Sequence, residues 1–218
     1  MTEELQQGTD EWRRARAGSL GASSLHEALA KTRNGWGASR ANLLSRLVVE
    51  RLTGVPQDTY QNQAMRNGIE REPEARAAYQ FEKATLVKTV GLIKHPTIAW
   101  SHCSPDGLVG DDGLVELKCP AENTHLETLL GAPPPQKYVY QCAWQMACTG
   151  RAWVDLVSYH PAFPESMQLH ITRIERDDNL IANLEKEVKV FLEEVDRTME
   201  ALLKKFPVEA SLRAEAAE

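Results

Sequence analysis

The most regular pattern of apolar and polar positions lies toward the end of the chain. Residues three and four apart fall on one face of an α-helix, so apolar side chains at these intervals predict a long amphipathic helix with one buried stripe. A similar pattern predicts a helix from Ala38 to Thr53, which Gly54 and Pro56 would end. The apolar positions of the long helix are Ile181, Leu184, Val188, Phe191, Val195, Met199 and Leu202.

Shorter apolar segments fill the middle of the chain, and they predict β-strands. Pro73 is expected to break or kink a helix that begins near Gln61, because proline removes a backbone hydrogen bond. The predicted strands cover residues 85–94, 98–103, 107–109, 114–119, 153–159 and 167–174. Further helices are predicted at residues 9–17, 23–31, 121–130 and 136–148, with a loop at residues 31–37.

This order of helices and strands predicts an α/β fold with a mixed central sheet flanked by helices on both faces. The 218 residues, of which 42% are apolar, suffice for one compact domain with a sizeable core. We therefore expect a single domain over residues 1–207 and a flexible tail over residues 208–218. No apolar run approaches membrane-spanning length, so we expect a cytoplasmic protein that does not bind membranes.

The four cysteines contain no CxxC pair. A disulfide framework is not expected in a chain of this length without signs of secretion. A zinc site is also disfavoured, because the spacing of the nearest His and Cys residues matches no closed structural pattern. The residues concerned are His102, Cys103, Cys119 and His125. Buried free thiols are the favoured interpretation.

Charge is distributed unevenly along a chain whose net charge is −6. Residues 12–51 contain eight Lys and Arg and two acidic residues, whereas residues 175–218 contain twelve acidic and seven basic residues. A basic first part allows a positive surface that faces DNA on a molecule with negative total charge. Two differently solvated faces would give the same pattern, so charge alone leaves both interpretations open.

The candidate chemistry centres on Asp106, Glu116 and Lys118. Side chains alternate along a strand, so Glu116 and Lys118 point to the same face. The pair Asp112-Gly113 favours a reverse turn, which would fold Asp106 back toward them. Two carboxylates beside an amine suit Mg²⁺, which binds one or two carboxylates together with substrate phosphate.

An ordinary surface hairpin with scattered charges is the alternative, because a bare D…ExK pattern is common. The neighbouring positions favour the metal site, because they are apolar and indicate buried strands, where clustered carboxylates need a partner. These apolar neighbours are Leu108, Val109, Leu114, Val115 and Leu117.

Two segments resemble the signature of the PD-(D/E)xK nucleases in its phage lambda exonuclease-like (YqaJ-type viral recombinase) version. They are Ser-Pro-Asp-Gly-Leu at residues 104–108 and Glu-Leu-Lys-Cys-Pro at residues 116–120. The resemblance covers most of the chain, and several separated motifs in the right order make it specific. The other motifs lie at residues 11–12, 16–18, 22–23, 68–72, 138–141 and 174–177.

The resemblance implies a restriction-endonuclease-like core and a homotrimeric ring that takes in the ends of duplex DNA. The activity it implies is a Mg²⁺-dependent, processive 5′-to-3′ exonuclease on linear double-stranded DNA. Such an enzyme leaves a 3′ single strand for a single-strand-annealing partner protein, in phage-type recombination in the bacterial host cytosol.

The resemblance also assigns catalytic roles. Asp106, Glu116 and the carbonyl of Leu117 would hold Mg²⁺, and Glu72 would help with a second ion, with Mn²⁺ left open as a substitute. Two metal ions can stabilise the attacking and leaving oxygens of a phosphodiester. Lys118 would orient the attacking water, and two nearby cations would lower its pKa as a base requires. Whether Lys118 is a base or an electrostatic anchor stays open, and an exposed helix charge is the alternative for Glu72.

The same resemblance places Arg16, Ser23, Ser104 and Gln141 around a 5′-phosphate. Arginine and serine are suitable donors to phosphate, and a helix start at Ser23 would favour an anion. A surface charge at Arg16, an N-cap at Ser23 and a turn residue at Ser104 are the alternatives. Gln141 is the most informative, because an amide in an apolar helix needs a buried partner. Many relatives carry a tyrosine four residues later, where this chain has Gln145.

Two further residues align with DNA contacts of the family. Met65 falls where the family has an apolar wedge between the terminal base pairs, although a core methionine is the alternative. Arg33 aligns with an arm that enters the minor groove, and a solvated loop arginine is the alternative.

Three other functions remain to be weighed against the exonuclease. A restriction-type endonuclease would share the fold and the metal site, and a non-catalytic subunit that binds DNA ends would share the fold alone. The presence of all four ligand-type residues disfavours that subunit. An iron–sulfur nuclease would need cysteines that flank the nuclease core, and here the four cysteines lie inside it.

Overall fold

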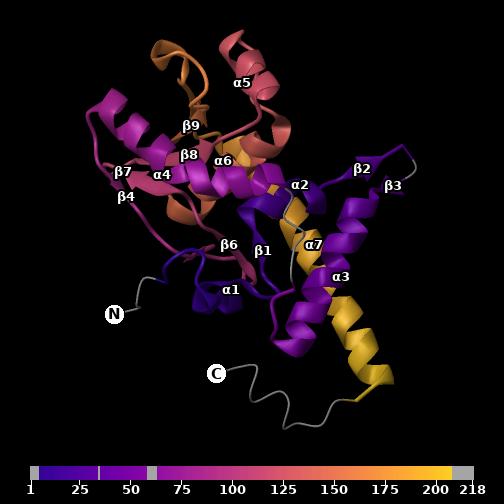
Figure 1. Cartoon of the computed structure of the whole chain (residues 1–218). Coiled ribbons are helices and arrows are strands. Elements are labelled where there is room, and N and C mark those ends of the chain that lie inside the picture. Colours follow the sequence, from indigo (N-terminus) through magenta and orange to yellow (C-terminus); the bar gives the residue numbers. More distant parts are fainter. Residues whose placement is uncertain (1–4, 34, 58–62, 208–218) are drawn as a thin grey trace.

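The computed structural model describes residues 5–33, 35–57 and 63–207, and for residues 63–67 and 69 it describes the backbone alone (Figure 1). The helices are α1 (Asp10–Arg16), α2 (Leu25–Ala28), α3 (Ala38–Thr53), α4 (Gln63–Lys83), α5 (Glu122–Leu129), α6 (Gln136–Thr149) and α7 (Asp178–Lys205), with short 3₁₀-helices η1 (Ala22–Ser24) and η2 (Glu165–Met167). The strands are β1 (Leu20–Gly21), β2 (Lys31–Thr32), β3 (Gly35–Trp36), β4 (Val87–Lys88), β5 (Ile93–Lys94), β6 (Ser101–Cys103), β7 (Gly107–Val109), β8 (Gly113–Lys118), β9 (Trp153–Tyr159) and β10 (Leu169–Glu175). The predicted tail, residues 208–218, lies outside the described residues, and the single domain over residues 1–207 stays a prediction.

Within the described residues, the central sheet has the strand order β10-β9-β8-β7-β4. Strands β8 and β9 run parallel, and the other neighbouring pairs run antiparallel. A smaller sheet has the order β1-β6-β5, and β2 pairs with β3 as a separate hairpin. The predicted α/β fold with a mixed central sheet is therefore confirmed.

Helices pack against both faces of the central sheet, as the side chains of β8 show. Leu114 belongs to a buried cluster with residues of α6 such as Trp144. The next residue, Val115, belongs to a second cluster with Tyr79 of α4. Because side chains alternate along a strand, Glu116 follows Leu114 onto the α6 face. The fold thus places this carboxylate between a strand and a helix.

The two helices with the clearest sequence patterns form as predicted. Helix α3 ends at Gly54, which has a φ of 68° and donates its N–H to the carbonyl of Glu50 at 2.8 Å. Helix α7 is capped by Asp177, whose carboxylate accepts from the N–H groups of Asn179 and Leu180. Its buried stripe comprises Ile181, Leu184, Val188, Phe191, Leu192 and Val195.

Pro73 was predicted to break or kink this helix, and the break is wrong, because α4 runs through this residue. Proline removes one backbone hydrogen bond, but Ala75 and Tyr79 in the following turns are buried against the sheet. Burial of these two residues stabilises the part of the helix that follows the proline. Tertiary packing here outweighs local preference.

The segment at residues 31–37, predicted as a loop, contains the β2–β3 hairpin. Lys31 pairs with Trp36, and the guanidinium of Arg40 lies 3.8 Å from the centroid of the Trp36 ring. The helix predicted over residues 23–31 is correspondingly shorter and ends at Ala28. Figure 1 shows that the hairpin projects away from the central sheet.

Other boundaries also differ from the sequence prediction, among them the strands predicted over residues 98–103 and 167–174, which begin at Ser101 and Leu169. The segment at residues 85–94 forms two strands, β4 and β5, which belong to different sheets. The turn between β7 and β8 is made by residues 110–112, with Gly110 at a φ of 53°, while Gly113 pairs with Val109 inside the hairpin.

None of the described helices combines the length and the apolar composition needed to cross a lipid bilayer.

Candidate active site

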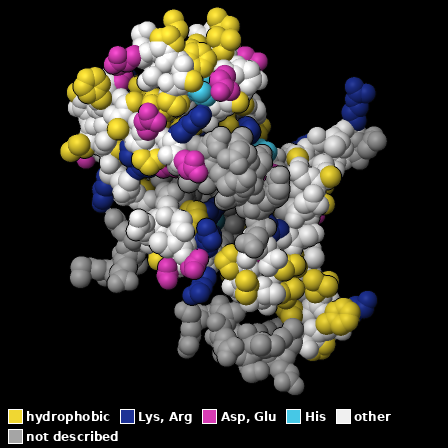
Figure 2. Space-filling view, in the orientation of Figure 1, with side chains coloured by type: hydrophobic (Ala, Val, Ile, Leu, Met, Phe, Trp, Pro, Cys, Tyr) yellow, Lys and Arg dark blue, Asp and Glu magenta, His cyan; other side chains and the backbone are white. Residues whose placement is uncertain are grey.

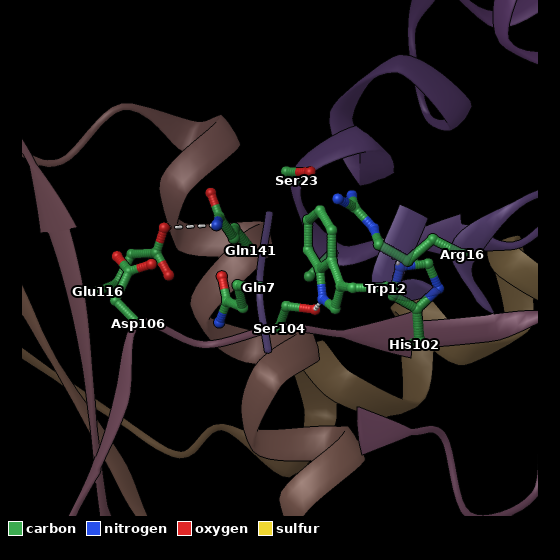
Figure 3. Close-up of a pocket in the computed structure, with 10 residues that line it drawn as sticks. Gln7, Trp12, Arg16, Ser23, His102, Ser104, Asp106, Glu116 and Gln141 are labelled. Carbon is green, nitrogen blue, oxygen red and sulfur yellow. Dashed lines mark hydrogen bonds between the residues drawn. The ribbon is translucent and has the colours of Figure 1, made fainter. Parts of the chain in front are cut away.

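A cavity of about 130 Å³ lies where β8 and α6 meet the first segments of the chain (Figure 3). One end of the cavity is acidic and is formed by Asp106 and Glu116. The other end carries the guanidinium of Arg16. The lining residues are Gln7, Trp12, Arg16, Ala22, Ser23, His102, Ser104, Asp106, Glu116 and Gln141.

Glu116 is 2% exposed, and nitrogen donors hold both of its carboxylate oxygens. Gln141 and Lys118 each donate to Oε1 at 2.5 Å, and Gln145 donates to Oε2 at 2.5 Å. The two amides lie four residues apart on α6, so they project from the same face of the helix. Gln141, predicted beside a phosphate, lines the cavity but has its closest contact there with the Glu116 carboxylate.

Asp106 lies directly before β7, and its Oδ2 accepts a hydrogen bond from the N–H of Leu117 at 2.6 Å. This bond turns the carboxylate toward Glu116, as Figure 3 shows. Burial raises the pKa of Asp106 well above its ordinary value, and the neighbouring Glu116 carboxylate raises it further, while Lys118 opposes both. The predicted convergence of Asp106, Glu116 and Lys118 is therefore present.

The protein environment raises the pKa of Lys118 instead of lowering it. Burial favours the neutral amine, but the carboxylates of Glu116 and Asp106 outweigh burial, so the pKa of Lys118 rises above its ordinary value. The ammonium also lies 4.9 Å from the centroid of the Tyr138 ring. With these neighbours alone, Lys118 is a cation at neutral pH and anchors Glu116.

The donor set at the acidic end fits a hard divalent cation. The described residues contain no group of three or more His, Cys, Asp and Glu side chains that could hold a metal ion. Mg²⁺ needs fewer protein ligands than three, because it keeps several waters and binds one or two carboxylates. Asp106 and Glu116 repel each other at a site largely removed from water, and a cation between them would offset this repulsion. The carbonyl of Leu117 is the remaining oxygen that the sequence predicts as a ligand.

Glu72 has a weaker connection to this site. It lies on α4, where its Oε1 accepts from Arg76 at 2.6 Å, and its side chain is 33% exposed. Glu72 also raises the pKa of Asp106, so the two carboxylates are within electrostatic reach. Its ion pair with Arg76 would have to open before Glu72 could bind a second metal ion.

The basic end of the cavity brings together three of the residues predicted around a phosphate. The Arg16 guanidinium lies 4.0 Å from the centroid of the Trp12 ring, and the Trp12 N–H donates to the Ser104 hydroxyl oxygen at 3.2 Å. Since that oxygen accepts from the indole, the Ser104 hydroxyl hydrogen is available to a ligand. Ser23 lies at the exposed rim, in η1. The helix start expected there is a short turn, so it adds no helix-terminus site for an anion.

Arg33, one of the two predicted DNA contacts, is not among the residues that line the cavity. Arg33 is exposed in the turn of the β2–β3 hairpin, and Figure 2 shows a basic side chain at the end of this projection. The side chain of Met65 lies outside the described residues, so its role as a wedge stays a prediction.

Sequence reasoning missed four residues of the site. Trp12 falls in one of the motifs that carry the resemblance, but it was given no role. Gln7 carries no distinctive local pattern, and it anchors the first segment by donating to the carbonyls of Val90 and Pro105 at 2.8 and 2.9 Å. Gln145 was visible as a second amide in the apolar segment that holds Gln141. His102 was visible in its spacing of two residues from Ser104.

Solved structures of known proteins share this architecture. An alkaline exonuclease from Laribacter hongkongensis, LHK-Exo, is 48% identical to this chain, and the match covers 90% of this chain and 97% of that chain with a TM-score of 0.84. LHK-Exo in complex with dAMP matches with the same identity and a TM-score of 0.85. A phage-related exonuclease from Haemophilus somnus 129PT has 13% identity and a TM-score of 0.67, over 87% of this chain and 99% of that chain, which shows a shared fold.

These matches confirm the predicted restriction-endonuclease-like fold of the PD-(D/E)xK type. No sequence among the curated proteins matches the chain. The YqaJ-like viral recombinase domain matches residues 11–152, a segment that contains the whole lining of the cavity apart from Gln7. The chain therefore belongs to the family of YqaJ-like viral recombinases.

Proposed function

We propose that this protein is an exonuclease that degrades one strand of linear double-stranded DNA from its 5′ end. One observation carries the proposal: a single cavity joins a carboxylate pair, Asp106 and Glu116, to a guanidinium, Arg16. The carboxylate pair suits a metal ion, and the guanidinium suits a terminal phosphate. The 48% identity to an alkaline exonuclease over nearly its whole chain supports the same activity.

Each residue has a role that follows from its contacts. Asp106, Glu116 and the carbonyl of Leu117 would hold Mg²⁺, Glu72 would reach a second ion, and Mn²⁺ could replace either. The bound metal ions would supply a nucleophilic water and stabilise the charge on the leaving oxygen. Lys118, fixed by its ion pair with Glu116, would orient that water beside the scissile phosphate.

Gln141 joins the carboxylate and the ammonium at the acidic end of the site. Its amide donates to Glu116 at 2.5 Å, and its oxygen accepts from Lys118 at 3.4 Å. These bonds fix the orientation of the carboxylate and the ammonium before substrate arrives. Arg16, Ser104 and Ser23 would bind the 5′-phosphate, which sets the polarity of digestion by placing the first phosphodiester at the metal site.

We further propose that the protein acts as a homotrimeric ring and supplies 3′ single strands to a single-strand-annealing protein. Enclosure of the duplex would make digestion processive without tight binding to each phosphate. The basic first part of an otherwise acidic chain supports such an arrangement, since a ring can present one positive surface to DNA.

Digestion of end-labelled duplexes tests the activity. With Mg²⁺, linear duplex DNA should lose one strand from its 5′ end, while covalently closed circles stay intact. Asp106→Asn should abolish cleavage and still bind linear DNA, because it removes a charged ligand and little volume.

Other outcomes would favour the alternative functions. Cleavage of circles as fast as linear DNA would indicate a restriction-type endonuclease. Binding of DNA ends without any cleavage by the unaltered protein would indicate an end-binding subunit. Either result would overturn the proposed function.

A further inference from the structure

Arg16 is held at its Nε by a buried histidine. The Nε–H group donates to Nε2 of His102 at 3.1 Å, and Nδ1 of His102 lies 2.8 Å from the hydroxyl oxygen of Ser19. His102 is the middle residue of β6, which pairs with strands on both sides, and it is 2% exposed. The chain Ser19–His102–Arg16 thus connects a fixed strand to the basic end of the cavity.

The identity of the donors determines the tautomer of His102. An arginine Nε carries a hydrogen and can only donate, so Nε2 of His102 must accept. The hydrogen of the neutral imidazole then lies on Nδ1, and it donates to Ser19. Burial lowers the pKa of His102 to about 3, and the charge of Arg16 contributes to the shift. His102 is therefore a neutral acceptor across the physiological pH range.

Two further neighbours restrict the guanidinium. The Trp12 ring covers one of its faces at 4.0 Å. A Cβ atom added to Gly21 would lie 3.0 Å from Nε2 of His102 and 3.5 Å from Nη2 of Arg16, so the glycine permits the close approach. In the part of the chain that the structure describes, neither Nη1 nor Nη2 has a hydrogen-bond acceptor. Figure 3 shows these two nitrogens directed away from His102.

We propose that His102, with Ser19, is a positioning residue that directs the two free nitrogens of Arg16 at the terminal phosphate and so makes the enzyme prefer 5′-phosphorylated ends. The inference rests on the proposed function. A free arginine side chain samples many rotamers, and a fork that is already oriented loses less entropy when it binds phosphate bidentately. His102 acts only through Arg16 and has no contact with the reacting atoms.

The test compares kcat/KM on linear duplexes with a 5′-phosphate and with a 5′-hydroxyl. His102→Leu removes the acceptor, and we expect it to lower the preference for phosphate about tenfold, the effect of one hydrogen bond of about 1.4 kcal/mol. Activity on 5′-hydroxyl ends should fall much less than activity on 5′-phosphorylated ends. His102→Gln should retain most of the preference, because its amide can accept from Arg16 and donate to Ser19.

His125→Leu is the matched control. His125 is also fully buried, and its Nδ1 also lies 2.8 Å from a serine hydroxyl, that of Ser158, but it does not line the cavity. This variant should leave the preference for phosphate unchanged. Equal losses on both kinds of end in His102→Leu, or an unchanged preference, would overturn the inference.

A second variant covers the case in which His102→Leu does not fold. Ser19→Ala removes the hydroxyl that keeps the imidazole hydrogen of His102 on Nδ1, so it should lower the preference for phosphate severalfold. An unchanged preference in this variant would overturn the inference. Arg16→Ala separates this inference from the proposed function. If the unaltered enzyme prefers phosphate and Arg16→Ala abolishes this preference, an unaffected His102→Leu contradicts the positioning role alone. If the unaltered enzyme digests 5′-phosphate and 5′-hydroxyl ends equally well, the proposed phosphate site itself is contradicted.

Discussion

At the scale of single residues, neutral amides and an imidazole orient the charged groups of the site, together with the ion pair between Lys118 and Glu116. Glu116 is held by two glutamines as well as by Lys118, and Arg16 is held by a neutral histidine. Neutral donors and acceptors orient a charge without cancelling it. The charge of Arg16 therefore remains available to a ligand in the cavity, whereas the charge of Glu116 is shared with Lys118.

The neutral state of His102 makes protein stability depend on pH. The pKa of His102 is about 3 in the folded protein and 6.5 in its ordinary state, so below pH 6.5 the unfolded chain binds more protons. The contribution of His102 to the free energy of unfolding is fully present above pH 6.5, and it is lost progressively as the pH falls toward 3. Glutamine does not titrate, so this loss should be absent in His102→Gln. Between pH 6.5 and 3, the free energy of unfolding of the wild type should therefore fall with decreasing pH more steeply than that of the variant, by up to ~1.4 kcal/mol per pH unit.

Urea unfolding of the wild type and His102→Gln at several pH values between 7 and 4 measures this difference. His26→Gln, a change at an exposed histidine, controls for the loss of a histidine as such. Parallel curves for the wild type and His102→Gln would show that His102 titrates normally, contrary to the expectation.

At the scale of elements, the β7–β8 hairpin determines the distance between the two carboxylates. Gly107, the first residue of β7, follows Asp106 directly, and a Cβ atom there would lie 2.0 Å from Cγ1 of Val87 on β4. Val87 is β-branched and cannot easily rotate away. Gly107→Ala should therefore displace β7, lower stability by about 1–3 kcal/mol, and reduce kcat by moving Asp106.

A second change tests this explanation. Val87→Ala removes the atom that the new methyl group would meet, so the double variant should recover most of the lost kcat and stability. Thermal unfolding and nuclease assays on both single variants and the double variant complete the cycle. If the double variant is no better than Gly107→Ala, strain against β4 is not the cause.

The helices and strands also show how much of the fold and the site could be predicted from the sequence. The helices with a clear apolar period, α3 and α7, and the alternation that brings Glu116 and Lys118 together follow from local rules. The division of β4 and β5 between two sheets depends on pairing with distant strands, and the continuity of α4 through Pro73 depends on burial of Tyr79. Gln7 joins the site through carbonyls more than 80 residues away, at Val90 and Pro105, which no local pattern can indicate.

At the scale of the whole molecule, the proposed function requires an acidic protein to stay on DNA. Exposed apolar side chains favour association between copies, and Figure 2 shows hydrophobic side chains gathered near the ends of α3 and α7. Val55 and Phe206, at the ends of these helices, are 56% and 61% exposed. Contacts between copies would remove such surface from water and could close a ring around the duplex.

If a ring encloses the duplex, mass and processivity should change together. The mass in solution should be three times the 24.4 kDa of one chain. An excess of unlabelled competitor DNA, added after digestion begins, should not stop the digestion of duplexes already engaged, because a threaded strand cannot leave a closed assembly. A mass of one chain, combined with an immediate stop on addition of competitor, would instead show that each encounter with DNA is independent and that enclosure has no part in the activity.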